Sequence, residues 1–223
     1  MDFLFPKQCL KCGDFGEYVC KDCFGRFIDI RRSQQCHVCK TAIVEGFVHE
    51  KCEQHTDLDG VLVCLDYTDL AERLITEIKY NLYFGIAKYV SGFYLDKAKS
   101  LIRSIQRDSL FVPVPIHKKR HFKRGFNQTE LISRNLSHSL EVEYSNLIKR
   151  TINTRTQVGL SKKQRQENLL SVFEVGKLSP MNANKKVILV DDIMTTGTTL
   201  EMCADALRKQ GFPKIYAIVM TRG

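Results

Sequence analysis

The sequence predicts an α/β protein with a mainly parallel sheet flanked by helices, preceded by a small cysteine-rich module. From Gly60 onward, short apolar runs alternate with stretches of helical period, which is typical of a parallel sheet covered on both faces. Before that point the texture differs, because eight of the nine cysteines fall within the first 64 residues. A chain of 223 residues can build one full α/β core and a smaller appendage. We therefore expect two domains, residues 1–58 and 59–223.

The first cysteine group has the spacing of a zinc site. Cys9-x-x-Cys12 is followed after seven residues by Cys20-x-x-Cys23, and two such turns can present four thiolates to one Zn²⁺. Disulfides are the competing interpretation, but they need an oxidising compartment, and closely spaced pairs suit a metal ion better than a bridge. Because this segment buries little core, we expect structural zinc to supply most of its folding free energy.

A second group begins at Cys36-x-x-Cys39 and continues through His49-x-x-Cys52. His49 stands where a repeat of the first pattern would place a cysteine, and His55 is a competing ligand. Free buried cysteines without metal are the alternative for both groups, and a stronger one for this group. The sequence thus predicts one or two zinc ions per chain.

The α/β part reads as alternating strands and helices. In chain order we expect a strand at Gly60–Tyr67, a helix at Asp69–Tyr80, a helix at Ile86–Ile105, a strand at Leu110–Val114, a helix at Asn127–Leu140, a strand at Lys186–Val190, a helix at Thr199–Gln210 and a strand at Ile215–Thr221. Cys64 and Cys203 fall within these elements and are predicted to be core residues. Parallel sheets bind ligands beyond the carboxyl ends of their strands. The long polar segment Asn153–Asn168 is interpreted as a lid over such a site.

The strand at residues 186–190 runs directly into Asp191-Asp192-Ile193-Met194-Thr195-Thr196-Gly197-Thr198-Thr199. Gly197 permits a tight bend, and the threonine hydroxyls lie beside the free backbone N–H groups of a helix N-terminus, so the turn predicts a phosphate cradle. Thr198-x-x-Glu201 has the spacing of a capping box.

Two adjacent carboxylates at a strand end need hydroxyl donors or a cation, and a ribose diol with Mg²⁺ supplies both. The GxxxxGK[ST] and GxGxxG patterns of other phosphate sites are absent. The plainer alternative is an acidic strand end followed by a threonine-rich turn without a ligand.

The thirteen residues 187–199 resemble the complete signature with which type I phosphoribosyltransferases bind phosphoribosyl pyrophosphate (PRPP). The resemblance implies the type I phosphoribosyltransferase fold, with Mg²⁺ accompanying PRPP. It also implies that Asp191 and Asp192 hold the ribose hydroxyls. The residues it places around the 5-phosphate are Thr195, Thr196, Gly197, Thr198 and Thr199.

Three further features narrow the resemblance. They are Val112-Pro113-Val114-Pro115, Arg124-Gly125-Phe126-Asn127-Gln128, and Gln157 followed by Arg165-x-x-Asn168-Leu169. Behind a cysteine-rich head, these resemble the ComF family of late-competence proteins over nearly the whole chain. The resemblance implies a role in natural transformation, with single-stranded DNA and other competence proteins as partners. His49 departs from an all-cysteine second zinc site.

The basic run from His117 to Arg124 follows a predicted strand end and can lie beside the ligand. It could neutralise the pyrophosphate of PRPP, for which Arg124 is the candidate, or hold single-stranded DNA by charge and by stacking on Phe122 and Phe126. The nucleic-acid candidates are Lys118, Lys119, Arg120 and Lys123. A solvated basic loop is the third interpretation. The same two roles are open to Lys162, Lys163 and Arg165 in the expected lid, and Arg165 is the stronger candidate for the PRPP site.

The net charge of +9 favours polyanionic partners. No uninterrupted apolar stretch reaches about 18 residues, and the N-terminus lacks the pattern of a signal peptide, so we expect a cytoplasmic protein.

Two activities remain open. The resemblance implies an enzyme that displaces pyrophosphate from C1 of PRPP by positioning and electrostatics, with an acceptor that the sequence does not name and no evident general base. The alternative is a competence factor that senses PRPP or binds single-stranded DNA without turnover.

Overall fold

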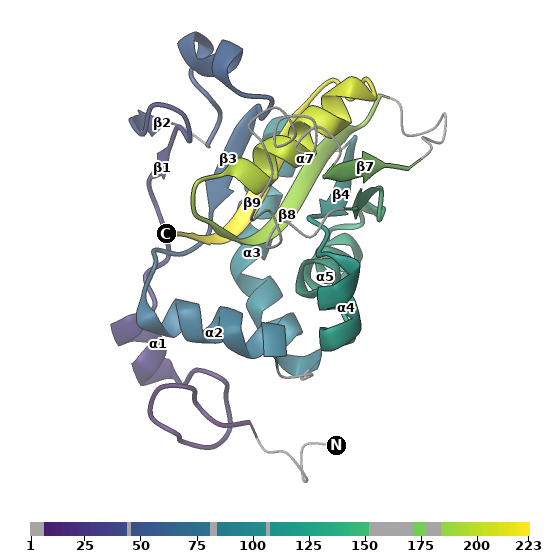
Figure 1. The fold of residues 1–223 in the computed structure, drawn as a ribbon. Coiled ribbons are helices and arrows are strands. Elements are labelled where there is room, and N and C mark those ends of the chain that lie inside the picture. Colours follow the sequence, from purple (N-terminus) through teal and green to yellow (C-terminus); the bar gives the residue numbers. More distant parts are fainter. Residues whose placement is uncertain (1–6, 44–45, 81–83, 106–107, 152–171, 177–183) are drawn as a thin grey trace, which may run out of the picture.

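A five-stranded parallel sheet forms the centre of the protein (Figure 1). The computed structural model describes residues 7–43, 46–80, 84–105, 108–151, 172–176 and 184–223. Across the sheet the strands are β3 (Gly60–Val63), β9 (Ile215–Arg222), β8 (Lys186–Met194), β4 (Ser109–Pro113) and β5 (Glu143–Tyr144). The predicted α/β architecture is therefore confirmed. The expected lid at 153–168 lies outside the described residues.

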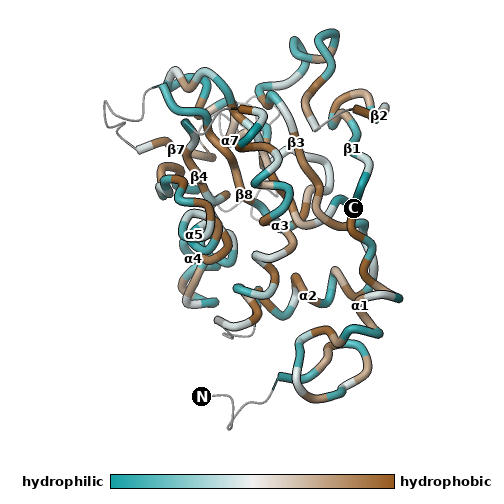
Figure 2. The backbone as a smooth tube through the Cα atoms, turned by 180° about the vertical axis from the view of Figure 1, so that it is seen from behind, coloured by the Kyte–Doolittle hydropathy of each residue, from teal (hydrophilic) through white to brown (hydrophobic). Residues whose placement is uncertain are grey.

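Helices cover both faces of this sheet (Figure 1). The helices are α2 (Asp69–Tyr80), α3 (Phe84–Ile105) and α5 (Gln128–Leu140) on one face and α7 (Thr198–Lys209) on the other, with the short α4 (Lys118–Arg124) before α5. Side chains alternate along β8, so Ile188 and Val190 join the core of the first face, whereas Val187 and Leu189 join the core under α7. In Figure 2 the strands of the sheet are largely hydrophobic, whereas the helices are of mixed hydropathy. None of the helices in the described ranges is long and apolar enough to cross a bilayer.

Smaller elements complete the described chain. They are α1 (Lys21–Phe27), β1 (Gln34–Gln35), β2 (Ala42–Ile43), the 3-10 helix η1 (Glu50–His55), β6 (Ile148–Arg150) and β7 (Phe173–Val175). Strands β1 and β2 form one antiparallel pair, and β6 and β7 form another.

The N-terminal residues pack closely on the α/β unit. Cys9 and Cys23 belong to the same hydrophobic cluster as α2 and α3, and the rings of Phe24 and Phe93 stack with centroids 6.0 Å apart. Further along, the side-chain amide of Gln34 exchanges two hydrogen bonds with the backbone of Val63 in β3. In Figure 1, α1 lies beside α2, and β1 and β2 lie beside β3. A division at residue 58 stays a prediction.

Most expected elements occur within one to three residues of their predicted ends, and α2 has the predicted bounds. Strand β3 ends at Val63, and Leu65 forms a bridge with Ile30 instead of continuing the strand to residue 67. Strand β8 continues four residues beyond the predicted end, because β9 is long enough to pair with it as far as Met194.

The two cysteines predicted to be core residues are confirmed as such. Cys64 is 1% exposed and Cys203 is 0% exposed. Each belongs to one of the two hydrophobic clusters that flank the sheet.

Candidate functional site

The two adjacent aspartates lie within β8, at its carboxyl end, where Asp191 pairs with Val219 of β9. The backbone N–H of Asp192 donates to Oδ1 of Asp191 over 2.9 Å, and the hydroxyl of the buried Tyr94 donates to the Asp191 carbonyl over 2.8 Å. Successive strand residues face opposite sides of a sheet, so the two carboxylates leave β8 in different directions. Their backbone is thus fixed from α3 as well as from the neighbouring strands.

Asp192 is 7% exposed and has two partners on one oxygen. Lys79 Nζ at the end of α2 lies 3.0 Å from Oδ2, and Gln128 Nε2 at the start of α5 donates to the same atom over 2.7 Å. Arg124 in turn donates from Nη1 to Oε1 of Gln128 over 3.3 Å, with its guanidinium 5.1 Å from the ring centroid of Tyr80. Arg124 therefore reaches the acidic pair through Gln128.

Asp191 has an unusual electrostatic environment. Burial and the nearby carboxylate of Asp192 raise the pKa of Asp191 to about 8, against the lowering effects of the Asp192 backbone N–H, Lys79 and Arg150. Burial and the charge of Arg120 lower the pKa of Arg150. A cation or a hydroxyl donor that binds here would relieve the repulsion between the two carboxylates.

The turn after β8 leaves a helix N-terminus open. Gly197 has φ +83°, a left-handed conformation that glycine adopts without the steric cost of a Cβ, and it is the N-cap of α7 with no side-chain cap. The hydroxyls of Thr196 and Thr198 lie 2.8 Å apart, and a small hollow of about 30 Å³ is lined by residues 193–200 and Asp191. The Thr198 N–H donates to Thr196 Oγ1 over 3.4 Å, and the remaining N–H groups of the first turn favour an anion.

The predicted capping box does not form, and that prediction is wrong. Glu201 turns away from the start of α7 and accepts hydrogen bonds from the Thr56 hydroxyl (2.6 Å) and the Asp57 backbone N–H (3.2 Å). Its Oε1 also lies 3.2 Å from Nε2 of His37. The first N–H groups of α7 therefore lack the carboxylate acceptor that the Thr198-x-x-Glu201 spacing predicted.

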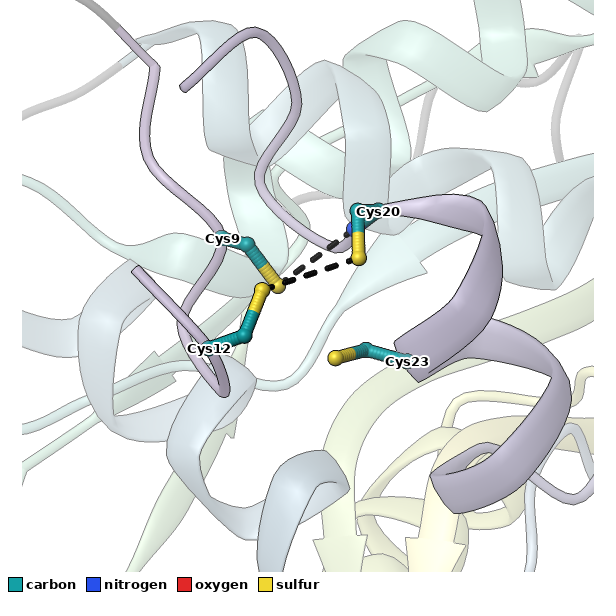
Figure 3. A group of neighbouring side chains, drawn as sticks. All are labelled: Cys9, Cys12, Cys20 and Cys23. Atoms are coloured by element: carbon teal, nitrogen blue, oxygen red, sulfur yellow. Dashed lines mark hydrogen bonds between the residues drawn. The ribbon is translucent and has the colours of Figure 1, made fainter. Parts of the chain in front are cut away.

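The first cysteine group brings four sulfurs together from a loop and the start of α1 (Figure 3). The four Sγ atoms of Cys9, Cys12, Cys20 and Cys23 all lie within 4.8 Å of one another. Those of Cys12 and Cys20 are 3.7 Å apart. Tetrahedral Zn²⁺ with bonds of about 2.3 Å places its sulfurs about 3.8 Å apart. The ligand set and its spacing fit one such ion.

The second group is equally compact. One nitrogen and three sulfurs, from Cys36, Cys39, His49 and Cys52, also lie within 4.8 Å of one another. Nδ1 of His49 is 3.3 Å from Sγ of Cys39. His55, the competing candidate, lies outside this group, and its Nε2 is 3.4 Å from the amide nitrogen of Gln54. Three sulfurs and one imidazole nitrogen are a ligand set typical of structural zinc.

One thiol of the first group, Cys9, and two of the second, Cys36 and Cys39, have lowered pKa values, and cysteine binds metal in the ionised form. Burial acts to raise the pKa of Cys9, but backbone N–H groups, including that of Cys20, outweigh it and lower the pKa to about 6. The side chain and backbone of Thr41 lower the pKa of Cys39 to about 5. The chain thus stabilises thiolates at both places.

The basic run forms a helix, α4, instead of a loop. Lys118, Lys119 and Lys123 are exposed, Arg120 is half-buried, and Phe122 is 93% exposed. The sequence left PRPP binding and single-stranded DNA binding both open for this run and could not divide its members between them. Arg124 turns toward Gln128, whereas the three lysines face solvent. Gln157, Lys162, Lys163, Arg165 and Asn168 lie outside the described residues.

Three residues at the acidic pair escaped sequence reasoning as site residues. Lys79 and Tyr94 look like ordinary members of amphipathic helices, and only the packing of α2 and α3 on the sheet brings them to β8. Gln128 did lie in one of the family-like runs, which was the available signal for it.

Comparisons with known proteins agree with this geometry. The phosphoribosyl transferase domain family matches residues 123–223. Competence protein F of Haemophilus influenzae is 31% identical over 173 residues, which cover 76% of each chain. The DNA utilization protein YhgH of Escherichia coli K12 is 32% identical over 160 residues, covering 70% of this chain and 69% of its own. Competence protein ComFC of Bacillus subtilis is 32% identical over 149 residues, covering 65% of this chain and 56% of its own.

The domain match contains β8, the acidic pair and the open end of α7, and the relatives extend the similarity well beyond that domain. The chain carries a phosphoribosyltransferase domain of the type I fold and belongs to the ComF family.

Proposed function

We propose that the protein binds PRPP together with Mg²⁺ at the carboxyl end of β8. The observation that carries this proposal is the juxtaposition of two carboxylates with an uncapped helix N-terminus, separated by one tight turn. A carboxylate pair suits a ribose diol and a cation, and free N–H groups beside threonine hydroxyls suit a phosphate. PRPP presents these groups in the same order along its length.

The roles divide along the segment. Asp191 and Asp192 receive the ribose hydroxyls, with Mg²⁺ close to them. The 5-phosphate lies against the turn from Thr195 to Thr199, including Gly197. Arg124 acts indirectly, because it orients Gln128, which in turn orients Asp192. Lys79 balances the charge of the pair when no ligand is present.

The two four-ligand groups are proposed to hold one structural Zn²⁺ each. The spacing of their ligand atoms and the thiolate-stabilising hydrogen bonds at Cys9 and Cys39 support this. Reduced thiolates of this kind suit the cytoplasm, where we propose that the protein acts.

The proposed biological role is the handling of incoming DNA during natural transformation. Two relatives are named competence proteins and a third is named a DNA utilization protein. A second candidate activity, binding of single-stranded DNA, is favoured by α4, where Phe122 projects into solvent among Lys118, Lys119 and Lys123. Aromatic rings beside lysines bind single strands by stacking and charge.

The test begins with PRPP and Mg²⁺ in a thermal unfolding experiment, because a ligand bound only by the folded state raises the melting temperature. The parent is expected to respond, and the variant D191N/D192N is expected to fold without responding. A full response of the variant would show that the site lies elsewhere. Labelled PRPP offered with a panel of nucleobases then separates a transferase, which forms products, from a sensor, which does not.

A further inference from the structure

Glu201 connects the start of α7 to the second metal-binding group. It lies in the first turn of the helix, and its backbone N–H donates to the carbonyl of Gly197 over 3.0 Å. Its carboxylate receives the hydroxyl of Thr56 at 2.6 Å and the N–H of Asp57 at 3.2 Å. His37 Nε2 lies 2.8 Å from the Thr56 hydroxyl oxygen and 3.2 Å from Oε1 of Glu201. Because Thr56 gives its own proton to Glu201, the His37 N–H is shared between these two acceptors. Three donors from the N-terminal segment thus converge on one side chain of α7.

These donors flank the ligands of the second group. His37 is the residue after Cys36, inside the turn that supplies two thiolates, and its side chain is 6% exposed. Lys40, which follows Cys39, donates from Nζ to the His37 carbonyl over 2.5 Å. Thr56 and Asp57 come directly after η1, which contains the fourth ligand, Cys52. Anything that orders this group therefore orders the donors to Glu201.

At its other end the connection reaches the phosphate cradle. Gly197 is both the N-cap of α7 and the acceptor for the Glu201 N–H, and its left-handed backbone sets the direction of the helix N–H groups. The position of Glu201 in the first turn of α7 has a second consequence. When it is released from its donors, its carboxylate is attracted to the positive end of the helix and competes with an anion there.

We infer that Glu201 is a positioning residue which couples metal binding at Cys36, Cys39, His49 and Cys52 to ligand binding at the open end of α7. This inference rests on the proposed binding of PRPP. An ordered second group holds Glu201 aside and leaves the cradle free for the 5-phosphate. By linkage, a phosphate in the cradle strengthens metal binding by the same factor. The first group packs on α2 and α3, and among the described residues no hydrogen bond of its cysteines reaches the start of α7.

The experiment uses full-length protein loaded with cadmium, because cadmium NMR distinguishes a four-thiolate site from a site with three thiolates and one imidazole. PRPP with Mg²⁺ is titrated into the parent while both resonances are followed, and its Kd is measured by calorimetry. We expect PRPP to shift the three-thiolate resonance and to leave the four-thiolate resonance in place. The variant T56V, which removes the shortest hydrogen bond to Glu201 without altering α7, is expected to bind PRPP about tenfold more weakly, within the range of about 5-fold to 150-fold usual for coupled sites.

A second variant separates positioning from simple structural support. In E201A the competing carboxylate is gone, so adding T56V to E201A is expected to produce no further loss of PRPP affinity, and PRPP is expected to leave the three-thiolate resonance unmoved. The matched control is D205A, because Asp205 lies one turn further along α7 and pairs with Lys209 on the same helix. Additive losses for T56V and E201A, or a resonance that PRPP does not move in the parent, would overturn the coupling while leaving PRPP binding intact. Failure of the parent to bind PRPP would overturn the proposed function and the coupling together.

Discussion

Gln128 donates a hydrogen bond from Nε2 to Oδ2 of Asp192 over 2.7 Å, in a setting where the aspartate is 7% exposed. The first residue of α5 therefore holds the orientation of a carboxylate at the end of β8. The same amide receives Arg124, so α4, α5 and the acidic pair form one continuous polar connection.

Replacing Gln128 with leucine tests this connection. The substitution removes a donor while the carboxylate of Asp192 stays buried, which is expected to lower the free energy of unfolding by about 1–3 kcal/mol. Q128L is therefore expected to unfold at lower urea concentration than the parent and to bind PRPP more weakly. The control is Q210L, because Gln210 is exposed at the opposite end of α7 from the cradle. Equal urea midpoints for Q128L and Q210L would contradict a stabilising role for this amide.

The raised pKa of Asp191 makes stability depend on pH. Because the folded state holds the proton up to about pH 8, against an unfolded value of about 3.9, the stabilisation from this group is complete below about pH 4 and is lost as pH rises toward the folded value. D191N cannot titrate there, so it is expected to lose less unfolding free energy than the parent between about pH 5 and about pH 8. Urea titrations at both pH values measure the difference. Parallel pH profiles for the two proteins would show that the pKa of Asp191 is not raised.

PRPP binding is expected to have the opposite pH dependence in the same window. The diol and Mg²⁺ require an ionised pair, so the affinity of the parent for PRPP is expected to rise as Asp191 loses its proton. Calorimetry across the window measures this, and an affinity that is flat with pH would mean that Asp191 is already ionised in the free protein.

Zinc content is the next expectation. We expect two zinc ions per chain by elemental analysis of purified protein, one in each four-ligand group. Chelation is expected to lower the melting temperature, because Cys9 and Cys23 belong to the cluster that supports α2 and α3, so loss of the first ion loosens that packing. Metal-free protein with a folded N-terminal segment would contradict zinc binding at the first group, whereas a stoichiometry of one would contradict it only at the second.

Sequence reasoning reached the fold because its signals were local. The apolar run of β8 and the helical period of α2 are legible in neighbouring residues, and the signature at 187–199 is contiguous. The four ligand atoms of each metal-binding group likewise come from short spacings. The two-residue strands β1, β2 and β5 carry no periodic pattern and exist only because a partner strand is present.

What sequence reasoning missed depends on contacts between distant segments. Lys79 and Asp192 are more than a hundred residues apart in the chain, and no spacing announces their 3.0 Å approach. The capping-box expectation failed for the same reason, because the Glu201 carboxylate accepts from Thr56 and Asp57 of a distant segment and the N-cap of α7 is Gly197 instead of Thr198. Local sequence patterns identify candidate site residues, whereas tertiary contacts determine which partners those residues have.

The last prediction concerns α4 and single-stranded DNA. Lys118, Lys119 and Lys123 are exposed, so their replacement by glutamine is expected to weaken binding and to make it less sensitive to salt. If all three contact phosphates, the slope of log affinity against log salt concentration falls by about 2, since each contact to a single strand contributes about 0.7. F122A, which removes a ring that is 93% exposed, is expected to weaken binding at every salt concentration and to leave the slope unchanged, because stacking releases no counterions.

Arg124 supplies the internal control for this prediction. Its side chain contacts Gln128, so R124Q is expected to reduce the melting shift caused by PRPP, whereas the triple lysine variant keeps that shift in full. Fluorescence anisotropy with a labelled oligonucleotide and thermal unfolding with PRPP, measured on the same preparations, separate the two functions. Unchanged DNA affinity of the triple variant at low salt would leave α4 without a nucleic-acid role. A PRPP response lost in the triple variant would instead give these lysines a role in PRPP binding, exerted by long-range charge.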